Sequence, residues 1–267
     1  MGVVNVTPDS FSDGGRFDRP EQAVAHALSL LQQGADLLDI GGESTRPGAE
    51  PVSEEAELAR VVPVIERLRE HTGAPLSIDT TKPAIMRAAV AAGADMINDV
   101  NALREPGALD AAAELGVPVC LMHMQGKPRT MQDNPRYDDV VAEVLAFFRQ
   151  RVQQCLEAGI ERESITLDPG FGFGKTLAHN LSLLDRLRDL GSLGYPLLVG
   201  ISRKSMLGAI TGRKHPDERT AASISAAVLA AQRGAAIVRV HDVAETVDAL
   251  KVWQALADMA VRRDTEA

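Results

Sequence analysis

The sequence contains few aromatic residues, and this limits the kinds of core that it can build. Phe, Trp and Tyr make up 3% of its 267 residues, whereas 45% are hydrophobic and Ala, Val, Leu and Ile supply most of these. That composition favours a parallel sheet wrapped in helices over an aromatic-rich β-sandwich. At this length we expect one large α/β domain, spanning residues 1–267, with a sizeable core.

Cysteines, basic clusters and long apolar runs are also scarce. Cys120 and Cys155 show no metal-binding spacing, so we expect buried, reduced thiols in a cytoplasmic protein. A formal net charge of −9, without a block of Lys or Arg, argues against nucleic acid as a partner. No apolar stretch is long enough to span a bilayer and no signal-peptide pattern precedes the first expected strand, so no membrane association is expected.

Short apolar runs alternate with amphipathic helical patterns along the whole chain. The expected strands are Gly2–Val6, Leu37–Ile40, Leu76–Ile78, Met96–Asn98, Val119–Met122, Ile165–Asp168, Leu197–Ile201 and Ile237–Val240. The helices expected to follow them are Glu21–Gln33, Glu54–Arg69, Pro83–Ala92, Gly107–Leu115, Asp138–Ala158, Asn180–Leu190, Glu218–Arg233 and Val243–Met259. Eight such units favour a closed (β/α)8 TIM barrel over an open doubly wound sheet.

Polar side chains recur where the apolar runs end. They are Asn5, Asp39, Asp79, Asn98, Asp168, Ser202, Arg203, Lys204, Arg239 and His241. The carboxyl ends of parallel barrel strands share one face of the barrel, and enzymes of this fold carry their chemistry there. We therefore expect these side chains to converge on an active site.

Three of these residues suit a flat heterocycle that is rich in nitrogen. The carboxylates of Asp79 and Asp168 can each accept two hydrogen bonds, from an amino group and an adjacent ring N–H. The amide of Asn98 supplies one donor and one acceptor. A divalent metal is the alternative ligand, but the sequence shows no tight cluster of Asp, Glu and His to hold it.

A second set of residues suits an anion. Arg239 and His241 flank Val240, so their side chains can point to the same face. Ser202–Ser205 is expected to open a helical turn, whose backbone N–H groups would face the same rim. Cations beside such a turn are what a diphosphate leaving group requires.

Three glycine-containing segments follow strands. Thr7–Gly15 and Gly41–Ala49 are long and polar, and loops of this kind are commonly lids or binding loops. The third, Pro169–Thr176, ends like a P-loop, but Pro169 stands where that motif needs a glycine. We interpret it as a turn in which Phe173 offers an apolar face beside Asp168.

Five segments resemble, in order, the signature motifs of the bacterial dihydropteroate synthase family. They are Asn5–Gly15, Gly41–Gly48, Leu167–Lys175, Ser202–Ser205 and Arg239–Asp242, and the resemblance covers essentially the whole chain. The chain departs from the family pattern at its amino terminus, where Met1 directly precedes the first strand. Residues that would plug the bottom of the barrel are expected to be missing, which bears on stability more than on chemistry.

The resemblance implies a pterin-binding (β/α)8 barrel that acts in folate biosynthesis. Such an enzyme joins 4-aminobenzoate to (7,8-dihydropterin-6-yl)methyl diphosphate and releases diphosphate. Its catalytic residues would be Asp168, Lys204 and Arg239. Sulfonamides that mimic 4-aminobenzoate are expected to compete for its pocket, and the family is usually homodimeric.

The resemblance also implies a role for each matching residue. The pterin would be bound by Asp79, Asn98, Met122, Asp168, Phe173, Gly200 and Lys204. The diphosphate would be bound by Asn5, Thr45, Arg46, Arg239 and His241, with Asn5 also binding the Mg²⁺ cofactor. The 4-aminobenzoate would be bound by Thr45, Arg46, Pro47, Phe173 and Ser205.

Two other functions could use part of this residue set. A methyltransferase domain that passes a methyl group from a folate to a corrinoid protein could share the pterin residues. It would have no use for Thr45, Arg46, Arg239 and His241 around a diphosphate. A non-catalytic paralogue that only binds pterin would not require Asn5, Arg46, Lys204 and Arg239 to be intact.

Overall fold

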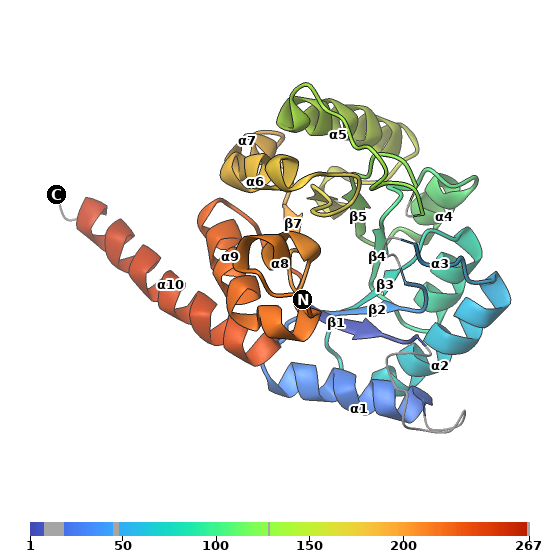
Figure 1. Ribbon diagram of the computed structural model, residues 1–267. Helices are drawn as coiled ribbons and strands as arrows, with labels where there is room; N and C mark the ends of the chain where they lie inside the picture. Colours follow the sequence, from blue (N-terminus) through green and yellow to red (C-terminus); the bar gives the residue numbers. More distant parts are fainter. Residues whose placement is uncertain (8–18, 45–47, 128, 266–267) are drawn as a thin grey trace.

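The computed structural model describes residues 1–7, 19–44, 48–127 and 129–265 of the protein. Within these residues, eight parallel strands follow one another around a barrel (Figure 1). The strands are β1 (Gly2–Asn5), β2 (Leu38–Gly41), β3 (Leu76–Asp79), β4 (Met96–Asp99), β5 (Val119–Met122), β6 (Ile165–Asp168), β7 (Leu198–Val199) and β8 (Ile237–Val238). Single bridges join Leu167 to Leu197 and Gly2 to Val240, which links β6 to β7 and β8 to β1. The predicted (β/α)8 barrel is confirmed.

Helices surround the strands on the outside of the barrel (Figure 1). They are α1 (Arg19–Gln32), α2 (Glu54–His71), α3 (Pro83–Ala91), α4 (Ala108–Leu115), α5 (Val140–Glu157), α6 (Leu177–Asp185), α7 (Leu187–Gly191), α8 (Ser205–Thr211), α9 (Thr220–Gln232) and α10 (Val243–Thr265). Short 3₁₀ turns, η2 (Arg162–Ser164) and η3 (Pro216–Arg219), precede β6 and α9. None of the described helices has the length and apolar character needed to cross a bilayer.

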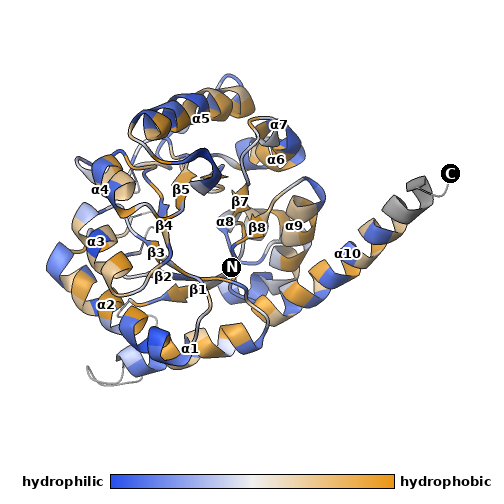
Figure 2. Ribbon diagram, turned by 180° about the vertical axis from the view of Figure 1, so that it is seen from behind, coloured by the Kyte–Doolittle hydropathy of each residue, from blue (hydrophilic) through white to orange (hydrophobic). Residues whose placement is uncertain are grey.

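The core lies between the strands and the inward faces of the helices. Leu38, Ile40 and Ile78 of the strands are fully buried, and so are Val61 and Ile65 of α2. Figure 2 shows the same division, with apolar colours on the central strands and mixed colours on the helices around them. Burial on both faces explains why these strands read as continuous apolar runs.

The helix ends follow the local signals in the sequence. Ser53 begins α2 by accepting a hydrogen bond from the N–H of Ala56 at 3.2 Å. Glycines with positive φ follow five of the described helices, at Gly34, Gly93, Gly116, Gly159 and Gly234. At Gly116, for example, φ is 65° and the N–H bonds to the carbonyl of Ala112, which ends α4.

Several predicted boundaries were wrong near the end of the chain. The single helix predicted over Asn180–Leu190 is two helices, α6 and α7, because Arg186 leaves helical geometry (φ −99°, ψ 27°). The strands β7 and β8 are shorter than predicted, and α8 is an additional helix. The last helix, α10, continues past the predicted end at Met259 and extends away from the barrel (Figure 1).

Candidate active site

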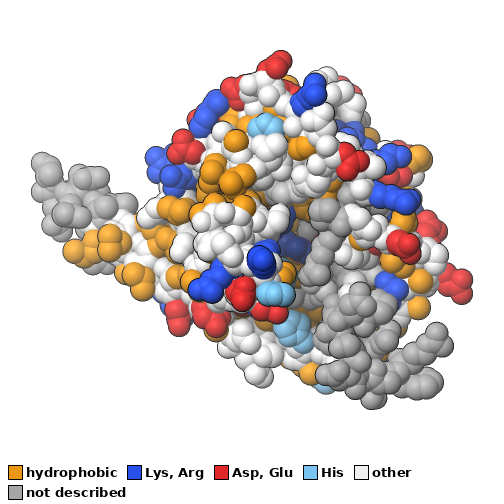
Figure 3. All heavy atoms as spheres, in the orientation of Figure 1, with side chains coloured by type: hydrophobic (Ala, Val, Ile, Leu, Met, Phe, Trp, Pro, Cys, Tyr) orange, Lys and Arg blue, Asp and Glu red, His pale blue; other side chains and the backbone are white. Residues whose placement is uncertain are grey.

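The carboxyl ends of the strands bring the predicted polar residues to one level of the barrel. Pairing between neighbouring strands aligns Asn5 with Gly41, Gly41 with Asp79, and Asp79 with Asn98. On the next two strands, Met122 of β5 aligns with Asp168 of β6. In the space-filling view, basic, acidic and histidine side chains gather around a hollow on this face, with basic side chains inside it (Figure 3).

Arg239, which follows β8, joins two acidic residues at the base of this site. Its Nε lies 2.5 Å from Oδ2 of Asp39, and its Nη2 lies 3.0 Å from Oδ2 of Asp79. The two carboxylates raise the pKa of the guanidinium further above its already high value, against the opposing effect of burial. Arg239 therefore stays charged, and the acidic and cationic sets predicted from the sequence form one continuous cluster.

Burial raises the pKa of Asp79, the negative charge of Asp39 adds to this shift and Arg239 opposes it, so that the pKa lies at about 7. The second oxygen of Asp79, Oδ1, is buried and has no hydrogen-bond partner within the described residues. An unpaired buried carboxylate oxygen is costly and calls for a ligand. Oδ2 of Asp79 thus pairs with Arg239, and Oδ1 can accept a hydrogen bond from a ligand.

The loop after β6 carries the third predicted acid and the predicted apolar face. Oδ1 of Asp168 accepts a hydrogen bond from the N–H of Gly170 at 2.8 Å. Burial raises the pKa of Asp168, and the positive charge of Lys204 opposes that shift. A Cβ at Gly170 would lie 2.0 Å from the carbonyl oxygen of His123, so only glycine fits this close approach.

Lys204 reaches over this loop from the start of α8. Its Nζ donates to the carbonyl of Phe171 and lies 4.3 Å from the centroid of the Phe173 ring. Burial lowers the pKa of Lys204 to about 8, although the nearby charge of Asp168 acts in the opposite direction. An aromatic ring, a cation and a carboxylate therefore lie close together at this loop.

A second lysine holds the same loop from beneath. The ammonium group of Lys175 is buried and contacts Nδ1 of His123 at 2.9 Å, together with the carbonyl oxygens of Gly170 and Phe173 at 3.0 Å. Burial and the adjacent lysine charge lower the pKa of His123 to about 2, so the ring is neutral and its Nδ1 can accept. Lys175 fixes the backbone that presents Phe173.

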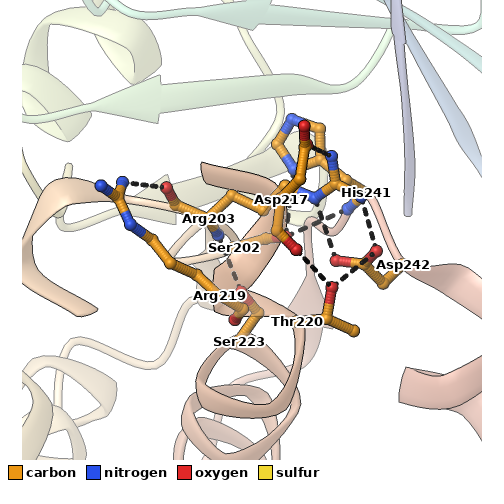
Figure 4. Close-up of polar contacts among 8 residues, drawn as sticks. All are labelled: Ser202, Arg203, Asp217, Arg219, Thr220, Ser223, His241 and Asp242. Atoms are coloured by element: carbon orange, nitrogen blue, oxygen red, sulfur yellow. Dashed lines mark hydrogen bonds and ion pairs between the residues drawn. The ribbon is translucent and has the colours of Figure 1, made fainter. Parts of the chain in front are cut away.

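The segments after β7 and β8 are tied together beside the site (Figure 4). Arg203 adopts a left-handed conformation, with φ of 59°, which is uncommon outside glycine. Its guanidinium pairs with Asp242 and Asp217, and its N–H donates to Oγ of Ser223 at 2.9 Å. Ser202 Oγ accepts the N–H of His241 at 3.2 Å and lies 3.0 Å from its Nδ1.

The structure brings most of the predicted site residues together. Asn5, Asp79, Asn98, Met122 and Asp168 are at the ends of strands β1, β3, β4, β5 and β6. A Cβ at Gly200 would lie 3.8 Å from Cβ of Arg239, so Gly200 borders that arginine. Ser205 is the first residue of α8 and is exposed. Thr45, Arg46 and Pro47 lie outside the described residues.

Comparison with known proteins identifies the family. Residues 1–241 match the model of the family described as pterin binding enzyme. Dihydropteroate synthase of Escherichia coli (strain K12) is 54% identical over 255 residues, which cover 96% of this chain and 90% of that protein.

Solved structures agree. The chain is similar to Xanthomonas albilineans dihydropteroate synthase with 4-aminobenzoic acid (61% identity, TM-score 0.92) and to the same enzyme in complex with 7,8-dihydropteroate (58% identity, TM-score 0.88). Each comparison covers 96% of this chain and 92% of the other. The chain therefore belongs to the pterin-binding enzyme family and, within it, to the dihydropteroate synthases, which are transferases.

Sequence reasoning gave no role to three residues that shape this site. Asp39 was recognised only as a polar residue at the end of an apolar run, yet it contacts Arg239 and Asn98. Asp242 and Lys175 lay inside recognised motifs, but their partners Arg203 and His123 are distant in the sequence. For Asp39 the available signal was a carboxylate within the otherwise apolar run Leu37–Ile40.

Proposed function

We propose that this site condenses 4-aminobenzoate with (7,8-dihydropterin-6-yl)methyl diphosphate, giving 7,8-dihydropteroate and diphosphate. The observation that carries the proposal is the contact between Arg239 and Asp79 at 3.0 Å. It joins a residue suited to a departing diphosphate to a residue suited to a pterin ring. A substrate whose pterin and diphosphate are linked by one methylene group needs both within a few ångströms.

The pterin slot would be formed by the acids, the amide and the apolar side chains of the loop after β6. Asp79, Asn98, Asp168 and Lys204 would bind the ring edge, with Met122, Phe173 and Gly200 lining the slot. Oδ1 of Asp79 supports this assignment because it is buried and has no partner within the described residues. Donors such as an amino group and a ring N–H would satisfy it.

The diphosphate would be bound by Asn5, Thr45, Arg46, Arg239 and His241. In the proposed mechanism the C–O bond breaks first, and diphosphate departs with the bonding electrons. The pterin methylene cation that remains would be stabilised by Asp168 and then attacked by the amine of 4-aminobenzoate, which loses its proton. Lys204 and Arg239 would complete the catalytic set by orientation and electrostatics, without a covalent nucleophile.

We further propose that Mg²⁺ binds next to Asn5. The described residues contain no group of three or more His, Cys, Asp or Glu side chains that could hold a metal alone. Mg²⁺ is commonly bound by one or two protein oxygens together with substrate phosphates, so one amide oxygen at the end of β1 fits this mode. When bound, Mg²⁺ would offset the charge of the departing diphosphate.

The 4-aminobenzoate pocket would be bordered by Thr45, Arg46, Pro47, Phe173 and Ser205. Both Phe173 and Ser205 are next to Lys204: the Phe173 ring contacts its ammonium group, and Ser205 follows it in the chain. An aminobenzoate seated there would present its amine towards the pterin slot. Closure of the two loops after β1 and β2 over the substrates would exclude water from the reacting cation.

We also propose that residues 1–267 form one domain, that the protein is cytoplasmic and that it forms a homodimer. The free, buried thiols of Cys120 and Cys155 support a reducing compartment. Exposed apolar residues on α10 support a partner: Val252 is 68% exposed, Leu256 70% and Met259 56%. Their spacing puts them on one face of α10. Light scattering of the wild type and of Leu256→Glu would test the dimer, which the substitution should dissociate.

Isothermal titration calorimetry tests the function against its two rivals. A synthase should bind 4-aminobenzoate only when a pterin analogue and diphosphate already fill their sites. A corrinoid-linked methyltransferase domain would show no dependence on diphosphate, and a non-catalytic paralogue would bind pterin without turning over the complete substrate pair. Binding of 4-aminobenzoate to the empty protein with undiminished affinity would contradict the proposal.

A further inference from the structure

Asp39 is a buried carboxylate in the interior of the barrel, within β2. It has no exposed surface, and strand pairing aligns it with Val3 on one side and Ser77 on the other. A buried charge is unfavourable unless it is paired and hydrogen-bonded. Burying the Asp39 carboxylate therefore costs folding free energy, and the contacts that offset this cost indicate what the residue does.

Among the described residues, one oxygen of Asp39 makes all of its side-chain hydrogen bonds. Oδ2 accepts from Nε of Arg239 at 2.5 Å and from Nδ2 of Asn98 at 3.1 Å. Oδ1 is buried and has no partner within the described residues. A carboxylate that served the fold alone would be expected to have both oxygens paired.

The contact with Asn98 fixes the orientation of an amide. An ionised carboxylate only accepts hydrogen bonds, so the side of Asn98 that faces Asp39 must be the NH₂ group. The carbonyl oxygen of Asn98 is then directed elsewhere, with one N–H left over. Asp39 thereby sets which end of the amide is offered as an acceptor to a ring bound above it.

The contact with Arg239 fixes a guanidinium. Nε bonds to Asp39 and Nη2 bonds to Asp79, which leaves the remaining N–H groups of Arg239 for an anion. Asp79 also has to serve the pterin, whereas Asp39 is fully buried beneath both residues. Asp39 is the partner that can hold Arg239 throughout the reaction.

We propose that Asp39 is a positioning residue that sets Asn98 for the pterin and Arg239 for the departing diphosphate. It acts through those two side chains and does not touch the reacting atoms. The inference rests on the proposed function, since it assigns a task within that reaction. It adds that Asp39 supports both the pterin subsite and the diphosphate subsite, so that substituting Asp39 affects both.

A double-mutant cycle with Asp39→Asn and Arg239→Ala tests this assignment. The readouts are kcat from diphosphate release and the dissociation constant of 6-hydroxymethylpterin from calorimetry. Asp39→Asn alone should lower kcat by roughly 10- to 100-fold and weaken pterin binding several-fold. In the Arg239→Ala background, Asp39→Asn should change kcat by less than about twofold, because Arg239, through which Asp39 acts on the departing diphosphate, is already gone.

Asp99→Asn is the matched control. Asp99 is equally buried, but within the described part of the chain its side chain accepts only from backbone N–H groups, those of Asn101 at 2.6 Å and Leu103 at 2.8 Å. Its loss should lower the melting temperature and act on kcat independently of Arg239. Wild-type kcat in Asp39→Asn, or losses from Asp39→Asn and Arg239→Ala that multiply, would overturn the assignment. If the wild type releases no diphosphate, the proposed function fails instead.

An experiment on the unsubstituted protein covers the case in which Asp39→Asn does not fold. The exchange of the Arg239 Nε–H proton with solvent is followed by NMR, assigned by its loss in Arg239→Lys. It should be slow with and without 6-hydroxymethylpterin, because Asp39 holds it in both states. Exchange as fast as that of the half-exposed Arg186, in either state, would refute the claim that Asp39 holds the guanidinium of Arg239.

Discussion

Arg203 and Asp242 form a bidentate ion pair, with Nε of Arg203 3.1 Å from Oδ2 of Asp242 and Nη2 of Arg203 2.7 Å from Oδ1 of Asp242. The pair joins the segment after β7, which carries Lys204, to the segment after β8, which carries Arg239 and His241 (Figure 4). Hydrogen bonding from Arg203 lowers the pKa of Asp242, and Asp242 raises that of Arg203. Two segments that carry predicted site residues are thus joined by an ion pair between their own side chains.

Asp242→Asn should loosen this connection. A partly exposed, bidentate pair is worth about 1 kcal/mol, so the free energy of unfolding at pH 7 should fall by about that amount. Because the pKa of Asp242 is lowered in the fold, the stabilisation is present above its ordinary pKa and is lost as the pH falls below it. Urea unfolding at pH 7 and in acid measures both effects, and the variant and wild type should converge in acid.

Arg186→Ala provides the comparison for that experiment, since Arg186 pairs with Asp139 and Asp189 at the surface. Exposed pairs contribute little, so its unfolding free energy should change much less than that of Asp242→Asn. If Asp242→Asn were no more costly than Arg186→Ala, the pair would have no part in holding the two segments.

Asp79 should make pterin binding depend on pH. Its pKa is raised to about 7, so the carboxyl group is largely protonated at pH 6 and largely ionised at pH 8. The ionised form accepts the hydrogen bonds of the pterin, so affinity should fall roughly tenfold from pH 8 to pH 6. Calorimetry with 6-hydroxymethylpterin checks this, and Asp79→Asn should bind more weakly, with a flatter pH profile. Equal affinity in Asp79→Asn would remove this residue from the slot.

Arg239→Ala should lower turnover by more than about 100-fold, the loss of charge-assisted contacts worth roughly 3 kcal/mol. Diphosphate release is the measurement. Arg233→Ala removes another arginine, one that contacts the carbonyl of Leu229 at 3.4 Å at the end of α9, and should keep wild-type turnover. An unchanged rate in Arg239→Ala would exclude this arginine from the diphosphate site.

Sulfonamides that mimic 4-aminobenzoate should inhibit by occupying its pocket. Their inhibition should be relieved as the 4-aminobenzoate concentration rises, because both ligands would require the same space beside Phe173 and Ser205. Initial rates at several concentrations of both compounds decide the matter. Inhibition that is insensitive to 4-aminobenzoate would mean that the sulfonamide and 4-aminobenzoate bind at different sites.

Much of the barrel could be predicted from the sequence because its signals are local. Apolar runs such as Val119–Met122, helix-ending glycines such as Gly116, and the eightfold alternation depend on residues that are close in the chain. The boundaries that failed depend on distant contacts. Arg186 interrupts the predicted helix where it pairs with Asp139, 47 residues earlier in the chain, and no helical periodicity reveals that.

The same division holds for the candidate site. Asp79, Asn98 and Asp168 could be selected because polar residues at the ends of parallel strands converge. The partnership of Asp39 with Arg239 spans 200 residues, and that of Lys175 with His123 spans 52, so neither leaves a pattern in the sequence. The strand-end residues could be selected from the sequence, whereas the partners that hold them could not.

The central claim is that one cluster binds the pterin and receives the departing diphosphate. A coupled diphosphate-release assay with both substrates, omitting each in turn, tests it most directly. We expect sustained release only when (7,8-dihydropterin-6-yl)methyl diphosphate, 4-aminobenzoate and Mg²⁺ are all present, with stoichiometric formation of 7,8-dihydropteroate. No release from the complete mixture, or equal release without 4-aminobenzoate, would contradict it.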